Sequence, residues 1–310
     1  MNTVGILLEQ MGMFVIYIIA GILLIKTHVL NRENLEVISR FVIRLALPMM
    51  IFINTVDGVQ KRTLFDSLPI LGIAAFMYIC LLVLGRISGK ILHLEGNRRK
   101  LYQAMSMFGN IGFMGIPVVA SIYPEKGILY ISVFTIIDQL MLWTLGVQLT
   151  SPAKKDHSAF NPGKLINPVT AAVFLALVCV MGEIQLPTVV DTAFQKIGAT
   201  ATPLAMIYLG GIFVCIDVWN YIKKLDYYGI VVIKMILFPI FFYWILGFLP
   251  VSQEIHVTMG LISAMPVMSS VVMMANAAGS DGDYAMGGIL VTTVCSIVTL
   301  PFVYWVFQMM

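Results

Sequence analysis

The stretch "FGNIGFMGIPVV", from Phe108 to Val119, interrupts a long apolar segment with residues that weaken a helix. It contains Asn110, Pro117 and three glycines within twelve residues. Glycine is about 1 kcal/mol less favourable than alanine in a helix, and proline removes one backbone hydrogen bond and clashes with the preceding turn. If this segment crosses a membrane, the freed backbone groups must be buried in protein or line a cavity. We therefore predict an unwound backbone between about Gly109 and Pro117.

The composition of the whole chain indicates that this segment does lie in a membrane. Of the 310 residues, 59% are hydrophobic and 11% are charged, and the mean hydropathy is +0.93. Soluble domains carry about 25% charged residues, and a soluble fold could not bury this much apolar surface. The net charge of +3 gives no reason to expect a nucleic-acid partner. We therefore predict an all-α, multi-pass membrane protein.

Ten stretches are apolar enough, and close enough to about 20 residues, to cross a bilayer as helices. Five precede a polar loop at residues 151–164 and five follow it, so residues 1–150 and 165–310 form two halves. In order, the expected spans are Val4–Ile25, Ile38–Val56, Leu68–Ile87, Leu101–Tyr123, Ile128–Leu149, Leu165–Met181, Phe194–Ile216, Tyr228–Leu249, Val257–Ala278 and Tyr284–Phe307.

The distribution of Lys and Arg predicts how these spans are oriented. If the N-terminus is outside, thirteen of the basic residues face the cytoplasm and four face the other side. Cytoplasmic loops carry an excess of Lys and Arg. We therefore expect both termini to be extracytoplasmic and the loop at residues 151–164 to be cytoplasmic.

The two halves share the positions at which their helices are interrupted. The second and seventh spans contain "LALPMMIFINTVDG" and "TATPLAMIYLGGIF", with Pro48 and Pro203 at a similar depth. The fourth and ninth spans are interrupted by "GNIGFMGIP" and by "SAMPVMSS", the latter from Ser263 to Ser270. Because each half has an odd number of spans, the second copy must be inverted in the membrane. Inverted repeats with paired broken helices are typical of secondary transporters.

The paired interruptions predict an anion site where the fourth and ninth spans cross. The ninth span should unwind near Ala264 to Ser270, and each break would expose the N-terminal end of a half-helix. Such an end carries about half a positive charge and attracts anions. The Asn110 amide can donate to a carboxylate, and the hydroxyls of Ser269 and Ser270 add further polar groups. The alternative is that the glycines only allow tight packing and that Pro117 makes a kink without a binding role.

The same residues resemble the auxin efflux carrier family of PIN-like transporters, which has bacterial members. The family pattern is an asparagine followed by a small and hydrophobic run that ends in "GIP", as from Asn110 to Pro117. The stretches "SAMPVMSSVVMMANAAGSD", "GGILVTTVCSIVTLPFVYWVF" and "INPVTAAV" are also similar to the family. The resemblance covers essentially the whole chain. The cytoplasmic loop is short, as in the bacterial malate or malonate permease-type members, whereas the plant carriers have a long one.

The resemblance implies ten transmembrane helices in two inverted five-helix repeats, with the fourth and ninth spans crossing. The first, second, sixth and seventh spans would form a scaffold, and the third to fifth and eighth to tenth would form a transport domain. It implies a protein of the bacterial inner membrane, with a homodimer as one arrangement, that moves malate, malonate or similar carboxylates by an elevator-like mechanism. The residues that this reasoning assigns to substrate binding are Asn54, Asn110, Ile111, Gly112, Pro117, Met265, Pro266, Ser269 and Ser270.

Three polar residues within the apolar spans are candidates for ion coupling. Asp138 lies near the middle of the fifth span beside Gln139, and Lys234 lies about one turn into the eighth span. An unpaired carboxylate inside a membrane costs several kcal/mol, so Asp138 should have either a function or a partner. It could bind a coupled H⁺ or Na⁺, or it could pair with a neighbouring amide or with Lys234. Lys234 could contact the substrate or the coupled ion, or its side chain could snorkel to the membrane surface or form a structural pair.

The pattern favours a secondary transporter of small organic anions over two other classes of protein. A cation or cation/proton antiporter of related crossover architecture is the alternative, although such antiporters usually carry more than one deep carboxylate. The sequence has no P-loop, no HExxH motif and no paired intramembrane aspartates, so we expect neither direct use of ATP nor an intramembrane enzyme. The histidines lie in loops or at span ends and the cysteines lack metal-ligand spacing, so we expect no metal site or cofactor.

Overall fold

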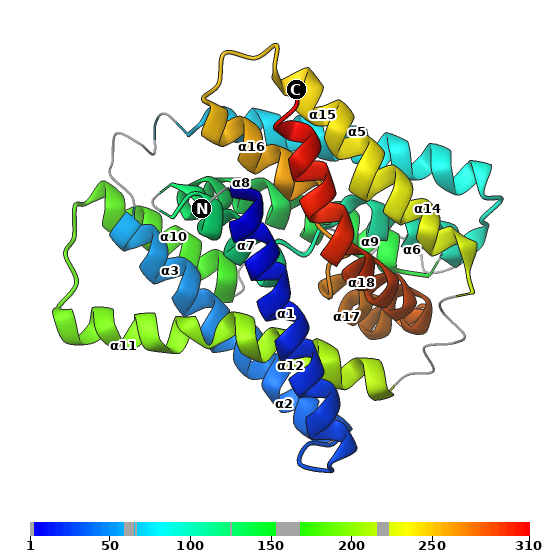
Figure 1. The fold of residues 1–310 in the computed structure, drawn as a ribbon, viewed down its shortest axis with the longest axis horizontal. Coiled ribbons are helices and arrows are strands. Elements are labelled where there is room, and N and C mark those ends of the chain that lie inside the picture. Colours follow the sequence, from blue (N-terminus) through cyan, green and yellow to red (C-terminus); the bar gives the residue numbers. More distant parts are fainter. Residues whose placement is uncertain (1–2, 59–64, 66, 125, 153–167, 216–222) are drawn as a thin grey trace. The chain divides into compact units, whose positions relative to one another are not determined.

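The computed structural model of the chain describes residues 3–58, 65, 67–124, 126–152, 168–215 and 223–310 (Figure 1). Across these residues the regular elements are helices, apart from one isolated pair of extended residues. Six helical segments are long and apolar enough to cross a membrane: Leu8–Lys26, Pro69–Ile91, Gly127–Thr150, Thr188–Cys215, Leu225–Leu246 and Gly282–Phe307. The prediction of an all-α, multi-pass membrane protein is therefore confirmed.

These six segments coincide with the first, third, fifth, seventh, eighth and tenth expected spans. The other four expected spans correspond to helices that are shorter, more polar or broken. Among them, Ile111–Ile122 and Ala171–Met181 are short apolar helices in the fourth and sixth expected spans. The predicted loop at 151–164 lies outside the described residues from residue 153 onward, as does the start of the sixth span.

The chain divides into two compact units, each built from three separate stretches of sequence. Unit 1 comprises Met1–Leu68, Gly112–Thr135 and Ile166–Val218, and unit 2 comprises Pro69–Ile111, Ile136–Leu165 and Trp219–Met310. The division passes through the helix α8 (Gly127–Met141) and through the π-helix η2 (Ile111–Gly115). Each unit is therefore an assembly of helices that are distant in the sequence.

Most helices of unit 1 pack against α3 or α12. Helix α3 lies against α10 and α11, and α12 lies against α1 and α2. Besides the parts of η2 and α8 noted above, the described helices of this unit are α1 (Thr3–Lys26), α2 (Arg32–Phe41), η1 (Val42–Ala46), α3 (Leu47–Gly58), α7 (Ile116–Ile122), α10 (Pro168–Met181), α11 (Thr188–Ala199) and α12 (Ala201–Cys215).

Unit 2 contains the first half of the fourth expected span and all of the ninth. Helix α6 packs against α5 and α18, and α16 packs against α5 and α15. Besides the end of α8, the described helices of this unit are α5 (Pro69–Ile91), α6 (Gly96–Met107), η3 (Leu142–Gly146), α9 (Val147–Thr150), α14 (Leu225–Val232), η5 (Ile233–Leu237), α15 (Phe238–Leu246), α16 (Gln253–Ser263), α17 (Ser270–Ala278) and α18 (Gly282–Phe307).

Three intramembrane prolines are accommodated by a widened helical turn. Pro48, Pro117 and Pro239 each lie two residues after a π-helical segment, namely η1, η2 and η5. Two of these segments show the π-helical hydrogen bond between residues i and i−5. The N–H of Leu47 donates to the carbonyl of Val42, and the N–H of Phe238 donates to the carbonyl of Ile233. A proline cannot donate to the carbonyl four residues earlier, and a π-turn shifts the hydrogen bonding past it. The backbone therefore remains helical at each of these three prolines.

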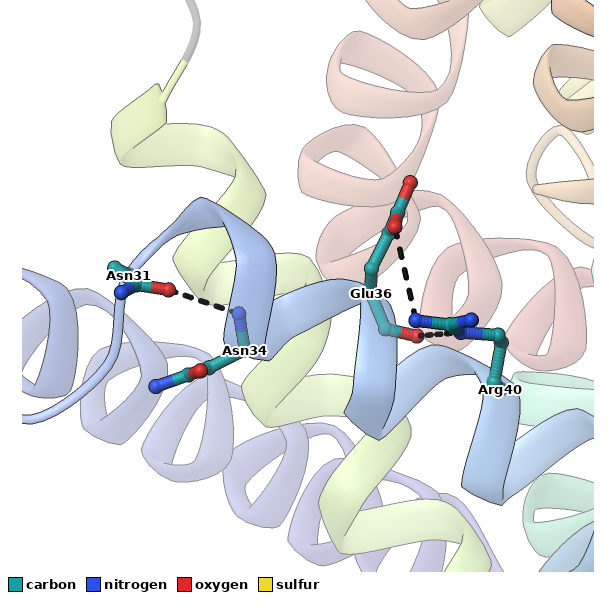
Figure 2. Close-up of polar contacts among 4 residues, drawn as sticks. All are labelled: Asn31, Asn34, Glu36 and Arg40. Carbon is teal, nitrogen blue, oxygen red and sulfur yellow. Dashed lines mark hydrogen bonds and ion pairs between the residues drawn. The ribbon is translucent and has the colours of Figure 1, made fainter.

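Helix α2 begins with a polar cap and is held by one buried side chain. Figure 2 shows the side-chain oxygen of Asn31 accepting a hydrogen bond from the Asn34 N–H at 2.9 Å, which satisfies a free donor of the first turn. One turn later Arg40 pairs with Glu36 at 3.9 Å between Nη2 and Oε2 (Figure 2). Both partners are exposed, so this ion pair contributes little to stability. Leu35 is the buried residue of the helix, and it lies against Gly211 of α12.

Helices α1 and α12 lie side by side (Figure 1) because each presents a glycine to the other. The α-carbon of Gly21 lies against the backbone carbonyl of Ile207, and that of Gly210 lies against the backbone carbonyl of Ile18. A Cβ atom at either glycine would collide with the facing backbone, which cannot move aside as a flexible side chain could. Small residues at a helix interface allow this close approach of backbones within a membrane.

We expect Gly210→Ala to lower the free energy of unfolding by about 1–3 kcal/mol, because the added methyl group forces α1 and α12 apart. The matched control is Gly12→Ala in α1, where an added Cβ would meet nothing within 4 Å. That control should be neutral or stabilising by up to about 1 kcal/mol, since alanine favours a helix. Thermal unfolding of the purified variants in detergent measures both effects. Equal midpoints for the two variants would contradict the close helix contact.

Candidate functional site at the helix crossing

Two helices of unit 2 are interrupted at the two stretches where the sequence predicts breaks. Helix α6 ends at Met107 and the chain becomes helical again at Ile111. Helix α16 ends at Ser263 and α17 begins at Ser270. The second break agrees with the predicted unwinding from Ala264 to Ser270, but the first is shorter than predicted. It covers only Phe108 to Asn110, because the π-turn of η2 accommodates Pro117 within a helix.

The two unwound segments pair with each other. Gly109 and Val267 form an antiparallel bridge. The N–H of Asn110 donates to the carbonyl of Pro266 at 2.7 Å, and the N–H of Met268 donates to the carbonyl of Phe108 at 3.0 Å. Backbone groups that leave a helix within a membrane need such partners. We call the segments 108–111 and 264–270, together, the crossing.

The close pairing of the two segments favours glycine at position 109. A Cβ atom built on Gly109 would lie 3.1 Å from the Cβ of Met265, which is closer than nearly all contacts of that kind. Because the Cβ of Met265 is fixed to its own backbone, it could yield only if the two segments separated. The glycine therefore allows the close backbone approach that the bridge needs.

Lys234 binds the ends of both broken helices. Its ammonium group donates to the carbonyl of Met265 at 2.9 Å and to that of Phe108 at 3.3 Å. The side chain is only 2% exposed, so the interpretation that Lys234 snorkels to the membrane surface is wrong. Phe108 caps the C-terminus of α6, and Met265 follows the cap of α16. Each helix C-terminus carries about half a negative charge, and the lysine supplies one positive charge to the two ends together.

Thr292 in α18 supports the crossing from a third helix. Its hydroxyl oxygen accepts a hydrogen bond from the Val267 N–H at 3.1 Å. The same hydroxyl donates to the carbonyl of Gly288 at 2.6 Å, one turn earlier in α18. Thr292 and Val267 are both fully buried. The Thr292 hydroxyl therefore satisfies the Val267 N–H, a backbone donor that lies in the unwound part of the ninth expected span.

The residues predicted to bind substrate are distributed over both units. Asn110 is 2% exposed and lies in the crossing through its backbone bond to Pro266. Of the others, those in unit 2 are Ile111, Met265 and Pro266, which are buried, and Ser269 and Ser270, which are half-buried at the start of α17. Those in unit 1 are Asn54 in α3, Gly112 in η2 and Pro117 in the first turn of α7, all half-buried.

Asp138 lies at the centre of a network of neutral hydrogen-bond donors. The Tyr78 hydroxyl donates to Oδ1 of Asp138, and Nε2 of Gln139 donates to Oδ2 at 3.0 Å. The Trp143 indole N–H in turn donates to Oε1 of Gln139 at 3.3 Å. Of the two structural partners that the sequence suggested, the neighbouring amide is therefore present. Asp138 and Lys234 are both described, and no ion pair joins them.

Three residues of this arrangement were missed by reasoning from the sequence. Tyr78 lies in an apolar run without a motif, and Phe108 and Thr292 lie within quoted stretches in which nothing distinguishes them from their apolar neighbours. The Tyr78 ring packs against the ring of Phe108 at a tilted angle, with a centroid distance of 5.7 Å, which connects Asp138 to the crossing. For Tyr78 and Thr292, the one signal in the sequence was a hydroxyl within an apolar segment, because a buried hydroxyl needs a hydrogen-bond partner.

Two broken helices are paired, and a buried lysine holds their ends. The chain also has several membrane-capable helices, and this combination is typical of a multi-pass membrane transporter. The chain belongs to the membrane transport protein family, whose profile matches residues 7–164 and 157–304. This confirms the resemblance to the auxin efflux carriers and their PIN-like relatives.

Two archaeal proteins illustrate how distant the named relatives are. An uncharacterized transporter of Methanothermobacter thermautotrophicus is 26% identical over 203 residues, which cover 63% of this chain and 64% of that protein. An uncharacterized transporter of Methanocaldococcus jannaschii is 22% identical over 192 residues, which cover 59% of this chain and 61% of that protein. The chain thus spans somewhat under two thirds of the length of these relatives, whose names give no substrate.

Proposed function

We propose that the protein is a secondary transporter of small organic anions, such as malate or malonate, and that it binds the carboxylate at the crossing. The observation that carries this proposal is the position of Lys234, whose ammonium contacts the carbonyl ends of both broken helices. A lysine there neutralises the negative ends of α6 and α16. The helices that follow begin at Ile111 and Ser270, and this lysine does not contact their positive ends.

The charges at the crossing favour an anion over a neutral ligand. Two helix N-termini carry about half a positive charge each, which together match one carboxylate. The buried amide of Asn110 adds a group that can donate to it, and the hydroxyls of Ser269 and Ser270 can do the same. Asn110 and Met265 are buried, so these weak charges act in a lower dielectric than that of water.

The alternative function, transport or antiport of a cation, has less support. A cation at the crossing would need the free carbonyl oxygens of the unwound segments. The carbonyls of Phe108 and Met265 already accept hydrogen bonds from Lys234. A second positive charge beside this ammonium would be repelled.

For the architecture, we propose ten transmembrane helices in two inverted repeats, with elevator-like movement of unit 2 relative to unit 1. The division of the chain supports this in part, because α1, α3, α10 and α12 of the scaffold spans fall in unit 1, although Gly112–Thr135 of the fourth and fifth spans fall there too. The crossing and the helices α5, α14 and α18 fall in unit 2. We further propose that the protein resides in a bacterial inner membrane, with extracytoplasmic termini, and that it forms a homodimer.

The function is tested by measuring carboxylate binding and transport with the purified protein. Malate, malonate, lactate and an aromatic carboxylate are each added in a thermal-shift assay, and the ligands that stabilise the protein are then used in proteoliposome uptake. We expect at least one to raise the unfolding midpoint and to accumulate in the vesicles. Failure of all four in both assays would overturn the proposal.

We expect Asn110→Ala to eliminate the thermal shift caused by the carboxylate while leaving the unfolding midpoint without ligand nearly unchanged. The fold should survive because Asn110 contacts Pro266 through its backbone N–H, which alanine retains. Asn34→Ala, at an exposed position of α2, is the matched control and should retain the full shift. A normal shift in Asn110→Ala would remove this side chain from the binding site.

A further inference from the structure

Two side chains of the types that are charged at neutral pH, Asp138 and Lys234, are buried in the described part of unit 2, and they have opposite charge. Asp138 is 3% exposed and Lys234 is 2% exposed. The other described acidic and basic residues of this unit lie at least partly at the surface. The charge in the interior of unit 2 therefore depends on these two residues and on whatever ligand binds there.

The positive charge of Lys234 is already matched within the protein. Its ammonium contacts the C-terminal carbonyl ends of α6 and α16, which carry about one negative charge in total. Among the described residues, no positively charged group pairs with Asp138. Its oxygens accept hydrogen bonds from the Tyr78 hydroxyl and the Gln139 amide, both of which are neutral.

The hydrogen-bond partners of Asp138 in the described part of the chain lie on α5 and α8. Tyr78 on α5 is the titratable group that contacts it, and Gln139 is its neighbour on α8. Tyr78 packs on the ring of Phe108, whose carbonyl accepts the bond from Lys234. The carboxylate is thus linked to the crossing through one fully buried tyrosine, Tyr78, which packs against Phe108 of the crossing.

A carboxylate substrate would bring a second negative charge into this interior. Two like charges in a low dielectric repel each other, and binding is then favoured when one of them is neutralised. We propose that Asp138 is the site of a proton that binds together with the carboxylate substrate and is carried with it. The carboxylate of Asp138 takes up one H⁺ to become a neutral carboxylic acid on loading and returns that H⁺ on release. This inference rests on the proposed function, and it makes the transporter a proton–anion symporter.

The experiment uses wild-type protein in proteoliposomes with an entrapped pH dye, with lactate as a probe that stays ionised above about pH 6. If another carboxylate is the one that binds, it replaces lactate at a pH where it is fully ionised. We expect anion uptake to acidify the lumen, an acidic exterior to stimulate uptake and a protonophore to remove that stimulation. The affinity for the anion should fall about tenfold for each pH unit above the range in which Asp138 titrates, because the binding of one anion is linked to the binding of one proton.

Asp138→Asn tests the residue itself, because asparagine keeps the shape and removes the titration. We expect this variant to bind the anion with an affinity that no longer changes with pH, and to move it without acidifying the lumen. Asp283→Asn, at an exposed position in the first turn of α18, is the matched control and should stay proton-coupled. Wild-type pH dependence in Asp138→Asn would overturn the inference.

Tyr78→Phe provides an independent test that does not depend on the folding of Asp138→Asn. Removing the hydroxyl takes away a donor that stabilises the ionised form of Asp138, so the pH dependence of binding should move to higher pH. An unchanged pH profile in this variant would also count against Asp138 as the proton site. If wild-type protein moves carboxylates with no proton flux, the inference fails while the proposed function stands. If it moves no carboxylate at all, the proposed function has failed.

Discussion

Lys234→Met is expected to abolish carboxylate transport and to lower the free energy of unfolding by about 3–5 kcal/mol. Methionine is similar in length to the lysine chain and fills the same volume, so the change removes the ammonium without leaving a large cavity. The carbonyls of Phe108 and Met265 would then lose the buried donor that they share. A buried polar group that loses its partner costs about 1–3 kcal/mol, and here two are affected.

The loss of transport in Lys234→Met should exceed what reduced stability explains. Without the ammonium, the negative ends of α6 and α16 are no longer balanced, and they would repel a carboxylate at the crossing. Uptake is measured in proteoliposomes at a temperature well below the unfolding midpoint of the variant. Lys90→Met, at an exposed position in the last turn of α5, is the matched control and should remain within about 0.5 kcal/mol of wild type.

A Lys234→Met protein with normal stability and normal uptake would show that the lysine does not hold the crossing. Lys234→Gln separates the two contributions of this side chain, because glutamine keeps a donor but has no charge. We expect it to recover part of the stability and little of the transport. Full transport in Lys234→Gln would mean that the hydrogen bonds matter and the charge does not.

Thr292→Val is the second substitution with a large expected effect, at about 1–3 kcal/mol of unfolding free energy. Valine has nearly the same shape as threonine, so the packing of α18 is preserved. The buried N–H of Val267 loses its acceptor, which is the Thr292 hydroxyl at 3.1 Å. Because Val267 forms the bridge with Gly109, we also expect weaker carboxylate binding in a thermal-shift assay.

The neighbouring residue offers a closely matched control. Thr293 is also buried in α18, but its hydroxyl has no hydrogen-bond partner among the described residues. Thr293→Val should therefore be neutral or stabilising, because it replaces a buried unsatisfied group with an apolar one. Comparing the unfolding midpoints of the two variants isolates the contribution of the bond to Val267. If both variants unfold at the same temperature, Thr292 does not support the crossing.

The places where the helices are interrupted could be predicted from the sequence, but their extent could not. Glycine, proline and serine in the stretches around Asn110 and Pro266 weaken a helix in any context, so the breaks are local properties. The return to helix at Ile111 depends on a π-turn ahead of Pro117, and hydrogen bonding of that kind has no signature in residue spacing. The predicted unwinding was therefore too long at its C-terminal end.

What the sequence by itself determined is the class of the protein: an all-helical, multi-pass transporter with two interrupted helices, because hydropathy and helix-breaking residues act locally. Only the tertiary structure decided which groups meet at the interruption. Lys234 is distant in sequence from Phe108, and Thr292 is distant from Val267, yet each pair is in contact. Backbone groups released from a helix inside a membrane must find partners, and those partners come from whichever helices the fold places beside them.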